Sequence, residues 1–108
     1  MGGQQLKGHL EALVLAVLES GPAHGYAIIE SLCATSGGVF DLPEGTVYPA
    51  LHRLQDAGLV TSSREVVGNR QRRVYCLAPA GRRSLRQRRV SWREFSTAVG
   101  RFLEVKPA

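Results

Sequence analysis

The chain contains little of what defines several large protein classes. Two cysteines, Cys33 and Cys76, among 108 residues are too few for a disulfide scaffold, and both lie in apolar patterns, which predicts reduced thiols in the core. The apolar run near the N-terminus, residues 10–18, is short and contains Glu11, so we expect no signal peptide. No stretch reaches the length of a transmembrane helix. These absences predict a cytoplasmic protein that does not enter a membrane.

The chain also lacks the residue patterns of catalysis and of metal binding. Its three histidines, His9, His24 and His52, have no paired spacing of the kind that binds zinc, either with each other or with the cysteines. There is no elbow around a nucleophile, no phosphate-binding loop and no pair of acids in an apolar segment. We therefore expect neither an enzyme nor a bound cofactor or metal. A regulator that senses metal or redox state through Cys33 remains an alternative.

Acidic residues are almost missing from one segment. Residues 64–93 contain ten arginines and a single acid, Glu65, which gives this segment a net charge of +9. Residues 1–63 carry a net charge of −4, and the whole chain has a formal charge of +5. Because cations that contact a nucleic-acid backbone release its counterions, a concentrated arginine block predicts an anionic partner such as DNA. A solvated arginine-rich face without a partner is the alternative.

Apolar residues elsewhere recur at helical spacing. Two such periods, at residues 6–18 and 26–33, are followed by glycine-containing turns and predict two helices. Pro43 opens a third helix, which Gly58 ends. Pro49 lies inside it and removes one helical hydrogen bond at a cost of about 3 kcal/mol. We therefore expect a kink or a loosened first turn, with the straight helix running from about residue 48 to 57.

The third helix has an apolar stripe of Val47, Leu51 and Leu54. Its opposite side has no aliphatic side chain and carries Gly45, Thr46, Tyr48, Pro49, His52 and Arg53. A helix that buries one face and offers small, hydroxylated and basic groups on the other is suited to the major groove of DNA.

Two strands are expected after this helix, at residues 60–67 and 72–77, joined by a basic turn at residues 68–71. A helix followed by a hairpin with arginines at its tip is the outline of a winged helix-turn-helix. We therefore predict a mainly α fold with a small β-hairpin (α+β). Residues 1–78 would form the DNA-binding domain, and residues 79–108 a long C-terminal dimerisation helix within the same structural unit.

The last segment has a heptad pattern. One core position holds Leu85, Trp92 and Val99, and the other holds Arg88, Phe95 and Phe102. This aromatic side has little of its own domain left to pack against, which predicts a homodimer. Trp92 and Phe95 of two copies could enclose a small aromatic or hydrophobic effector, although plain dimer core is the more common use of such spacing. Arg88 either extends outward or faces an acid or an anionic ligand.

On these residues the chain resembles the PadR family of transcriptional regulators, in its compact form with a single C-terminal helix. The matching segments are residues 10–18, 24–28, 44–54, 58–60, 72–77 and 80–81, and the string Gly-Thr-Val-Tyr-Pro-Ala-Leu at 45–51 is the specific one. Ala78 departs from the threonine usual in the family, so the last helix is expected to begin loosely. The resemblance implies a homodimer that binds palindromic promoter DNA, usually as a repressor, and that is released by an effector near the dimer interface.

Physical chemistry then assigns roles on the predicted DNA-binding helix. Gly45 has no side chain, so its backbone can approach a phosphate, and the hydroxyls of Thr46 and Tyr48 can bond phosphate or contact a thymine methyl. Arg53, with His52 beside it, is the best candidate for bidentate recognition of guanine. The expected partner is double-stranded DNA with an inverted-repeat operator.

Roles outside that helix are assigned in the same way. Tyr26 could donate to a phosphate at the start of the second helix, or close the core instead. Asn69, Arg70, Arg72 and Arg73 in the wing should contact the backbone or enter the minor groove. An alternative function is a winged helix used for protein–protein contact, in which the arginines meet an acidic partner.

Overall fold

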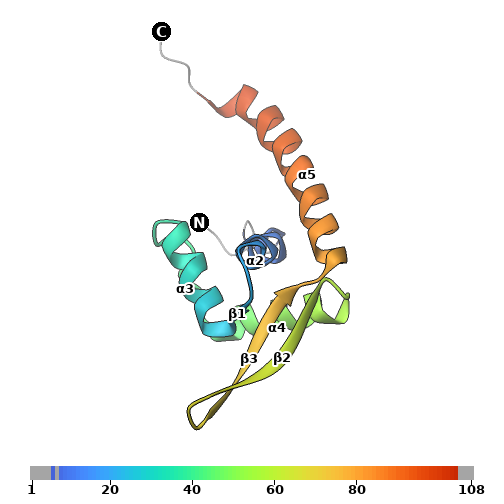
Figure 1. Ribbon diagram of the computed structural model, residues 1–108. Helices are drawn as coiled ribbons and strands as arrows, with labels where there is room; N and C mark the ends of the chain where they lie inside the picture. The colour runs from blue at the N-terminus through green and yellow to red at the C-terminus, as the bar shows by residue number, and fades with distance from the viewer. Residues whose placement is uncertain (1–5, 7, 105–108) are drawn as a thin grey trace.

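The computed structural model describes residue 6 and residues 8–104. In chain order its elements are α2 (Leu10–Glu19), β1 (Ala23–His24), α3 (Gly25–Thr35), α4 (Glu44–Asp56), β2 (Val60–Val67), β3 (Arg70–Leu77) and α5 (Pro79–Leu103). Helices α2, α3 and α4 gather together, the hairpin of β2 and β3 extends to one side, and α5 extends to the other (Figure 1). The predicted α+β arrangement is confirmed. None of the described helices combines the length and apolarity needed to cross a membrane.

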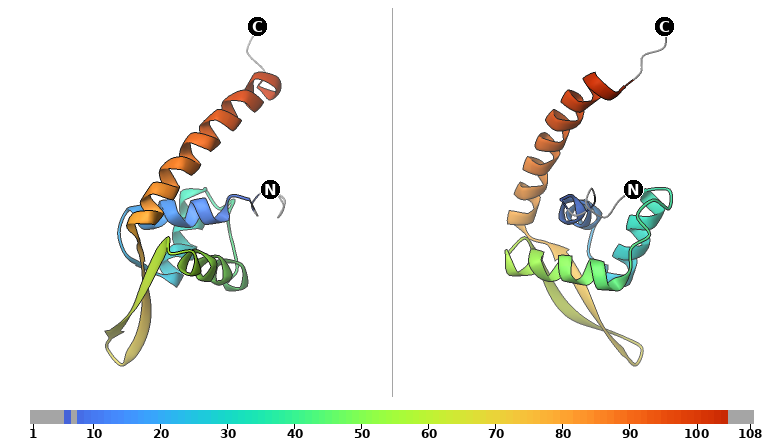
Figure 2. Two further views of the ribbon diagram at one scale, coloured as in Figure 1. Left: turned by 90° about the vertical axis from the view of Figure 1, so that its right-hand side faces the viewer. Right: turned by 180° about the vertical axis from the view of Figure 1, so that it is seen from behind.

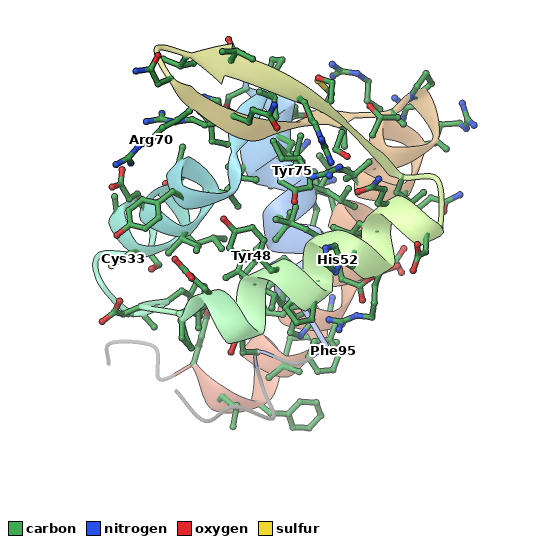
Figure 3. The ribbon with its side chains drawn as sticks, turned by 90° about the horizontal axis from the view of Figure 1, so that it is seen from below. Cys33, Tyr48, His52, Arg70, Tyr75 and Phe95 are labelled. Atoms are coloured by element: carbon green, nitrogen blue, oxygen red, sulfur yellow. The ribbon has the colours of Figure 1, made fainter. Side chains whose placement is uncertain are left out.

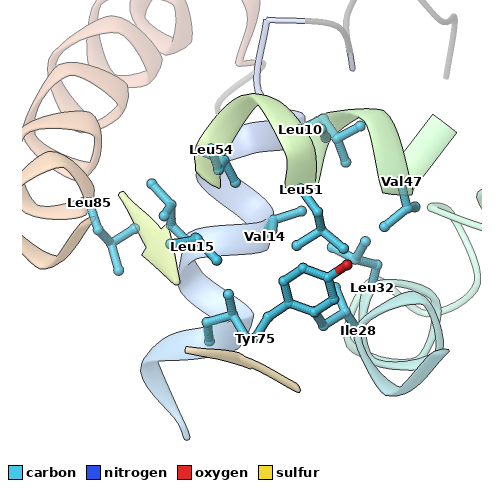
Figure 4. Packing of buried hydrophobic residues seen from close by; sticks show 13 residues of the cluster. Leu10, Val14, Leu15, Ile28, Leu32, Val47, Leu51, Leu54, Tyr75 and Leu85 are labelled. Carbon is cyan, nitrogen blue, oxygen red and sulfur yellow. The ribbon is translucent and has the colours of Figure 1, made fainter. Parts of the chain in front are cut away.

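One apolar core lies where the three short helices meet the sheet (Figure 4). The expected stripe of α4, Val47, Leu51 and Leu54, is completely enclosed in it. Fully burying a side chain of this size stabilises a fold by about 2 kcal/mol, so the stripe alone determines which face of α4 remains free. Ala50 of α4 joins them, and the remaining members come from every other long element: Leu10, Val14, Leu15, Leu18, Ile28, Leu32, Val60, Tyr75 and Leu85.

Helix α4 is continuous from Glu44 through Pro49 to Asp56, so the predicted loosened first turn is wrong, whereas a kink at Pro49 stays a prediction. Proline at this position leaves the carbonyl of Gly45 without its helical donor. Gly45 is exposed, and water can satisfy that carbonyl. The amides of Thr46 and Val47 both donate to the carbonyl of Pro43, at 3.0 and 3.2 Å, and hold the first turn.

The sheet has three strands in the order β1-β3-β2. Strands β2 and β3 pair at eight consecutive positions, from Val60 opposite Leu77 to Val67 opposite Arg70. The turn is therefore two residues long, with Gly68 at φ +63°, and the predicted four-residue turn is wrong. Strand β1 was not predicted, because a two-residue strand is too short to show a period; it pairs with β3 at Tyr75 and Val74.

Helix α5 begins firmly, although Ala78 supplies no side-chain cap. The amide of Ala78 donates to the carbonyl of Leu59 at 3.0 Å, and the amide of Arg82 donates to the carbonyl of Ala78 at 3.0 Å. Gly81 lies so close to the carbonyl of Leu59 that a Cβ atom there would clash with backbone. The expected loose start is not seen: the amides of the first turn receive no side-chain cap, but the hydrogen bond from Ala78 to Leu59 and the close approach of Gly81 anchor that turn to the chain before β2.

A bidentate ion pair fixes α5 further along. Arg89 donates through both terminal nitrogens to the carboxylate of Glu19, at 2.8 Å each, and so joins α5 to the end of α2. The end of α5 extends away from the other elements (Figure 2).

Candidate nucleic-acid interface

The free face of α4 has at its centre Gly45, Pro49, His52 and Asp56, all exposed. These residues lie opposite the buried stripe. In Figure 3, seen from below, α4 crosses the view with His52 on it, and the hairpin runs alongside. The structure therefore presents this face and the hairpin on one side of the molecule, away from the far end of α5.

Arg53 lies at the edge of this face rather than at its centre. Its Nε is 4.0 Å from Oε2 of Glu11 on α2, and its side chain remains 57% exposed. Thr46 is half-buried and lies on the same edge, about two helical turns before Arg53. An exposed pair at this distance is weak, so the guanidinium remains able to reach another partner.

The two tyrosines considered for DNA contact have different surroundings. Tyr26, on the first turn of α3, is 62% exposed and is not a core residue. Tyr48 is half-buried against the core, and a Cβ on Gly25 would lie 2.5 Å from its hydroxyl oxygen. The glycine at position 25 therefore makes room for the Tyr48 ring, which packs α4 against the start of α3.

The third tyrosine closes the core beneath these two. Tyr75, on β3, is 2% exposed and lies among the side chains of α3 and α4 in Figure 4. Burial raises the pKa of its hydroxyl; the charge of Arg73 opposes this, and the neighbouring Tyr48 adds to it. Tyr75 is therefore a neutral core residue at physiological pH.

The hairpin, which we call the wing (residues 60–77), has arginines on both faces. Arg73 points toward α4: it donates to the hydroxyl of Ser62 at 3.0 Å and lines a shallow hollow with His52, Gln55 and Asp56. Sequence reasoning did not single out Ser62, Gln55 or Asp56, because only the fold brings β3 beside the end of α4.

The opposite face of the wing contains its one acid. Glu65 lies directly across from Arg72, and Nε2 of His24 is 3.7 Å from its Oε2. Arg70 stands next to the turn, where Asn69 is exposed. Of the wing arginines considered for DNA contact, Arg72 is therefore the one that has a carboxylate opposite it.

The side chains at the predicted heptad core positions of α5, which we call the seam, lie in two different environments. Leu85 is 2% exposed and belongs to the core of its own chain, whereas Trp92, Phe95 and Phe102 are 54%, 60% and 87% exposed. Trp92 makes an edge-on contact with His9 at 5.1 Å between ring centres, and Phe95 lies 6.2 Å from it. Val99 is half-buried.

Arg88, the unusual residue of the seam, donates from Nε to the hydroxyl of Ser84 on its own helix at 3.0 Å. Cys33 and Cys76 are both free thiols. Within residues 6 and 8–104, no three His, Cys, Asp or Glu side chains gather in a way that could hold a metal ion.

The three packed helices α2, α3 and α4 share an apolar core with the wing, and this arrangement defines a winged helix-turn-helix protein. The model of the transcriptional regulator PadR-like family matches residues 14–87, and the chain belongs to this family. The family is one of transcriptional regulators, which agrees with the expectation that the chain is not an enzyme.

Several known proteins are similar to this chain. The transcriptional regulator Rv3488 of Mycobacterium tuberculosis is 47% identical over 55 residues, 51% of each chain. The chain spans about half of that relative's length, and 26% and 31% of two further curated relatives. A PadR family regulator from Eggerthella lenta is 32% identical with a TM-score of 0.82, covering 95% of this chain and 88% of that one. Bacillus subtilis PadR, solved in complex with operator DNA, is 22% identical with a TM-score of 0.66, covering 92% and 49%.

Proposed function

We propose that the protein is a dimeric, sequence-specific DNA-binding regulator that represses a nearby promoter and is relieved by a small effector bound near the dimer interface. The observation that carries this proposal is the pairing of one free, non-aliphatic face of α4 with an arginine-bearing wing on the same side of the molecule. Bacillus subtilis PadR, which has this fold, was solved with operator DNA, and that supports the assignment.

In this proposal α4 enters the major groove through Gly45, Thr46 and His52, and Arg53 turns from Glu11 to a guanine. Tyr26 bonds a phosphate beside the start of α3. Tyr48 has a hydroxyl close to Gly25 and acts mainly by placing α4. The wing, through Asn69, Arg70, Arg72 and Arg73, contacts the backbone and the neighbouring minor groove.

The dimer forms through the far half of α5. Its apolar side chains on one side, Trp92, Phe95 and Phe102, are each more than half exposed in a single chain. Water-exposed aromatics of this size favour association, since burial contributes about 25 cal/mol per Å² of apolar surface. The effector, a flat aromatic or hydrophobic molecule, would bind beside Trp92, where the indole is already in contact with His9.

A gel-shift assay with the DNA upstream of the protein's own gene tests the proposal. We expect binding at low salt, loss of binding for Gly45→Glu, and, for Arg53→Ala, a relaxed preference at one base pair costing about 1–3 kcal/mol. A symmetric operator should have half-sites about 34 Å apart, one helical turn. Absence of binding at low salt would overturn the proposal. Binding that ignores sequence, together with a functional Gly45→Glu variant, would instead favour an acidic protein partner.

A further inference from the structure

The two faces of the wing differ in how their charges are balanced. Because side chains alternate along a strand and paired residues share a face, the face toward α4 carries Arg64 and Arg73, and the opposite face carries Glu65, Arg70 and Arg72. The only acid of the wing therefore lies on the face away from α4. The arginines near α4 share their face with no carboxylate of the wing.

Arg64 and Arg73 lie directly opposite each other in the ladder. Counted from the two-residue turn, theirs is one of the closer pairs of an antiparallel ladder, with Cα atoms about 4.5 Å apart. Like charges in this position destabilise a hairpin. On the other face, the corresponding neighbour of Arg72 is Glu65, an attractive pair. The free protein thus carries a local repulsion on one face of the wing that an anion would relieve.

The position of Arg73 indicates where that anion would lie. Ser62 accepts a hydrogen bond from Arg73 at 3.0 Å, and this fixes the guanidinium over the hollow lined by His52, Gln55 and Asp56. Asp56 contributes a carboxylate to the lining, but the ion pairs formed by the described residues do not include one between it and Arg73. The hollow separates α4 from the wing. In the proposed function, a DNA strand between the major groove that α4 enters and the minor groove that the wing contacts would pass through this position.

We propose that Arg64 and Arg73 together hold one backbone phosphate of duplex DNA in the hollow between α4 and the wing, and that Ser62 acts as a positioning residue for Arg73. This rests on the proposed DNA-binding function and adds to it a specific clamp, including Arg64. Guanidinium groups suit this role because their planar array of donors matches the oxygens of a phosphate.

The salt dependence of DNA affinity tests the clamp in the full-length protein, measured by fluorescence anisotropy with the operator duplex at a series of potassium chloride concentrations. Log affinity falls as log salt rises, and loss of one phosphate contact reduces the magnitude of this negative slope by about 0.9. Arg64→Gln and Arg73→Gln should each lower it by about that amount. Because both side chains hold the same phosphate, the double variant should lose no more than the larger single loss. Ser62→Ala should lower affinity less than Arg73→Gln, and Ser62→Thr, which keeps the hydroxyl, should restore it.

Arg72→Gln is the matched comparison, because it removes the same charge from the opposite face of the wing, where the proposed function gives Arg72 a backbone contact of its own. Its loss of slope should therefore add to that of Arg73→Gln, whereas the loss for Arg64→Gln should not. An unchanged slope for Arg64→Gln would overturn the clamp while leaving DNA binding intact. Slope losses that add fully in the double variant of Arg64 and Arg73 would also overturn it, since they indicate two separate phosphates.

A second measurement needs no DNA. At low salt, Arg64→Gln should raise the melting temperature of the free protein, whereas Arg72→Gln should not, because the latter removes an attraction to Glu65. High salt should erase the difference by screening. If the wild-type protein bound no DNA at all, the proposed function would fail, and this measurement would still decide whether Arg64 and Arg73 repel each other. A melting temperature unchanged or lowered by Arg64→Gln would contradict that repulsion.

Discussion

The two halves of α5 use the same apolar pattern in different ways. In the near half, residues 79–88, Gly81 and Leu85 are buried against the rest of the chain. In the far half, residues 89–103, Trp92, Phe95 and Phe102 are 54%, 60% and 87% exposed. The near half therefore completes a core inside one chain. Within the described residues, the far half leaves its apolar side mostly exposed, with His9 in contact with Trp92. The ion pair between Glu19 and Arg89 lies at the boundary between the two halves.

The largest effect should come from the near half. Gly81→Ala places a Cβ against the carbonyl of Leu59, which is main chain and cannot move aside alone. Forcing an atom into such a contact costs about 3 kcal/mol. We expect a corresponding fall in the free energy of unfolding in urea and a lower melting temperature.

Gly100→Ala in the far half is the matched control. There the new Cβ would lie 3.4 Å from the flexible side chain of Glu104, an ordinary contact. Alanine favours a helix over glycine by about 1 kcal/mol, so this variant should be as stable as the wild type or more so. If both variants lost the same stability, the proposed difference between the halves would be wrong.

The next largest effect concerns association rather than folding. Trp92→Glu should leave the circular dichroism of the protomer intact and weaken the proposed dimer by about a hundredfold, as expected for the loss of a central tryptophan. Analytical ultracentrifugation over a range of concentrations measures it. Val90→Glu is the control, because Val90 is also half exposed but projects from the opposite side of the helix. A dimer that survives Trp92→Glu and dissociates with Val90→Glu would place the interface on the other side of α5.

Local patterns explain why much of this fold could be predicted. The buried stripe of α4 follows from the spacing of Val47, Leu51 and Leu54, and the wing follows from two β-rich runs around Gly68. The heptad pattern could not separate Leu85 from Trp92, because both occupy the same position of the repeat. Only the packing of α2 beside the first turns of α5 distinguishes an internal contact from an external one.

The details of the candidate site depended on register, which sequence reasoning misjudged. A four-residue turn at residues 68–71 places Arg64 opposite Tyr75, whereas the actual two-residue turn places it opposite Arg73. The predicted register therefore gives Arg64 no arginine partner. Likewise, the proximity of Glu11 to Arg53 depends on how α2 crosses α4, which no periodicity within either helix reveals.

The smallest effect is expected at the boundary between the halves, where Arg89 bonds Glu19. The hydrogen bonds from the Arg89 guanidinium, with its charge, hold the pKa of the Glu19 carboxyl below its ordinary value of 4.5. A carboxyl whose pKa is lower in the folded state stabilises the fold above its unfolded pKa and loses that contribution as the pH falls through the folded value. Glu19→Gln should therefore lower the melting temperature slightly at neutral pH, and the difference from wild type should shrink progressively below pH 4.5.

Both partners are almost half exposed, which keeps this contribution small and sensitive to salt. Glu11→Gln provides the comparison, since Glu11 meets Arg53 by a single contact at 4.0 Å instead of two at 2.8 Å. It should shift the melting temperature less than Glu19→Gln at neutral pH. A larger shift for Glu11→Gln would mean that the ion pair of α2 with α4 contributes more stability than the ion pair of α2 with α5. The Glu19–Arg89 pair would then not mark the boundary between the two halves of α5.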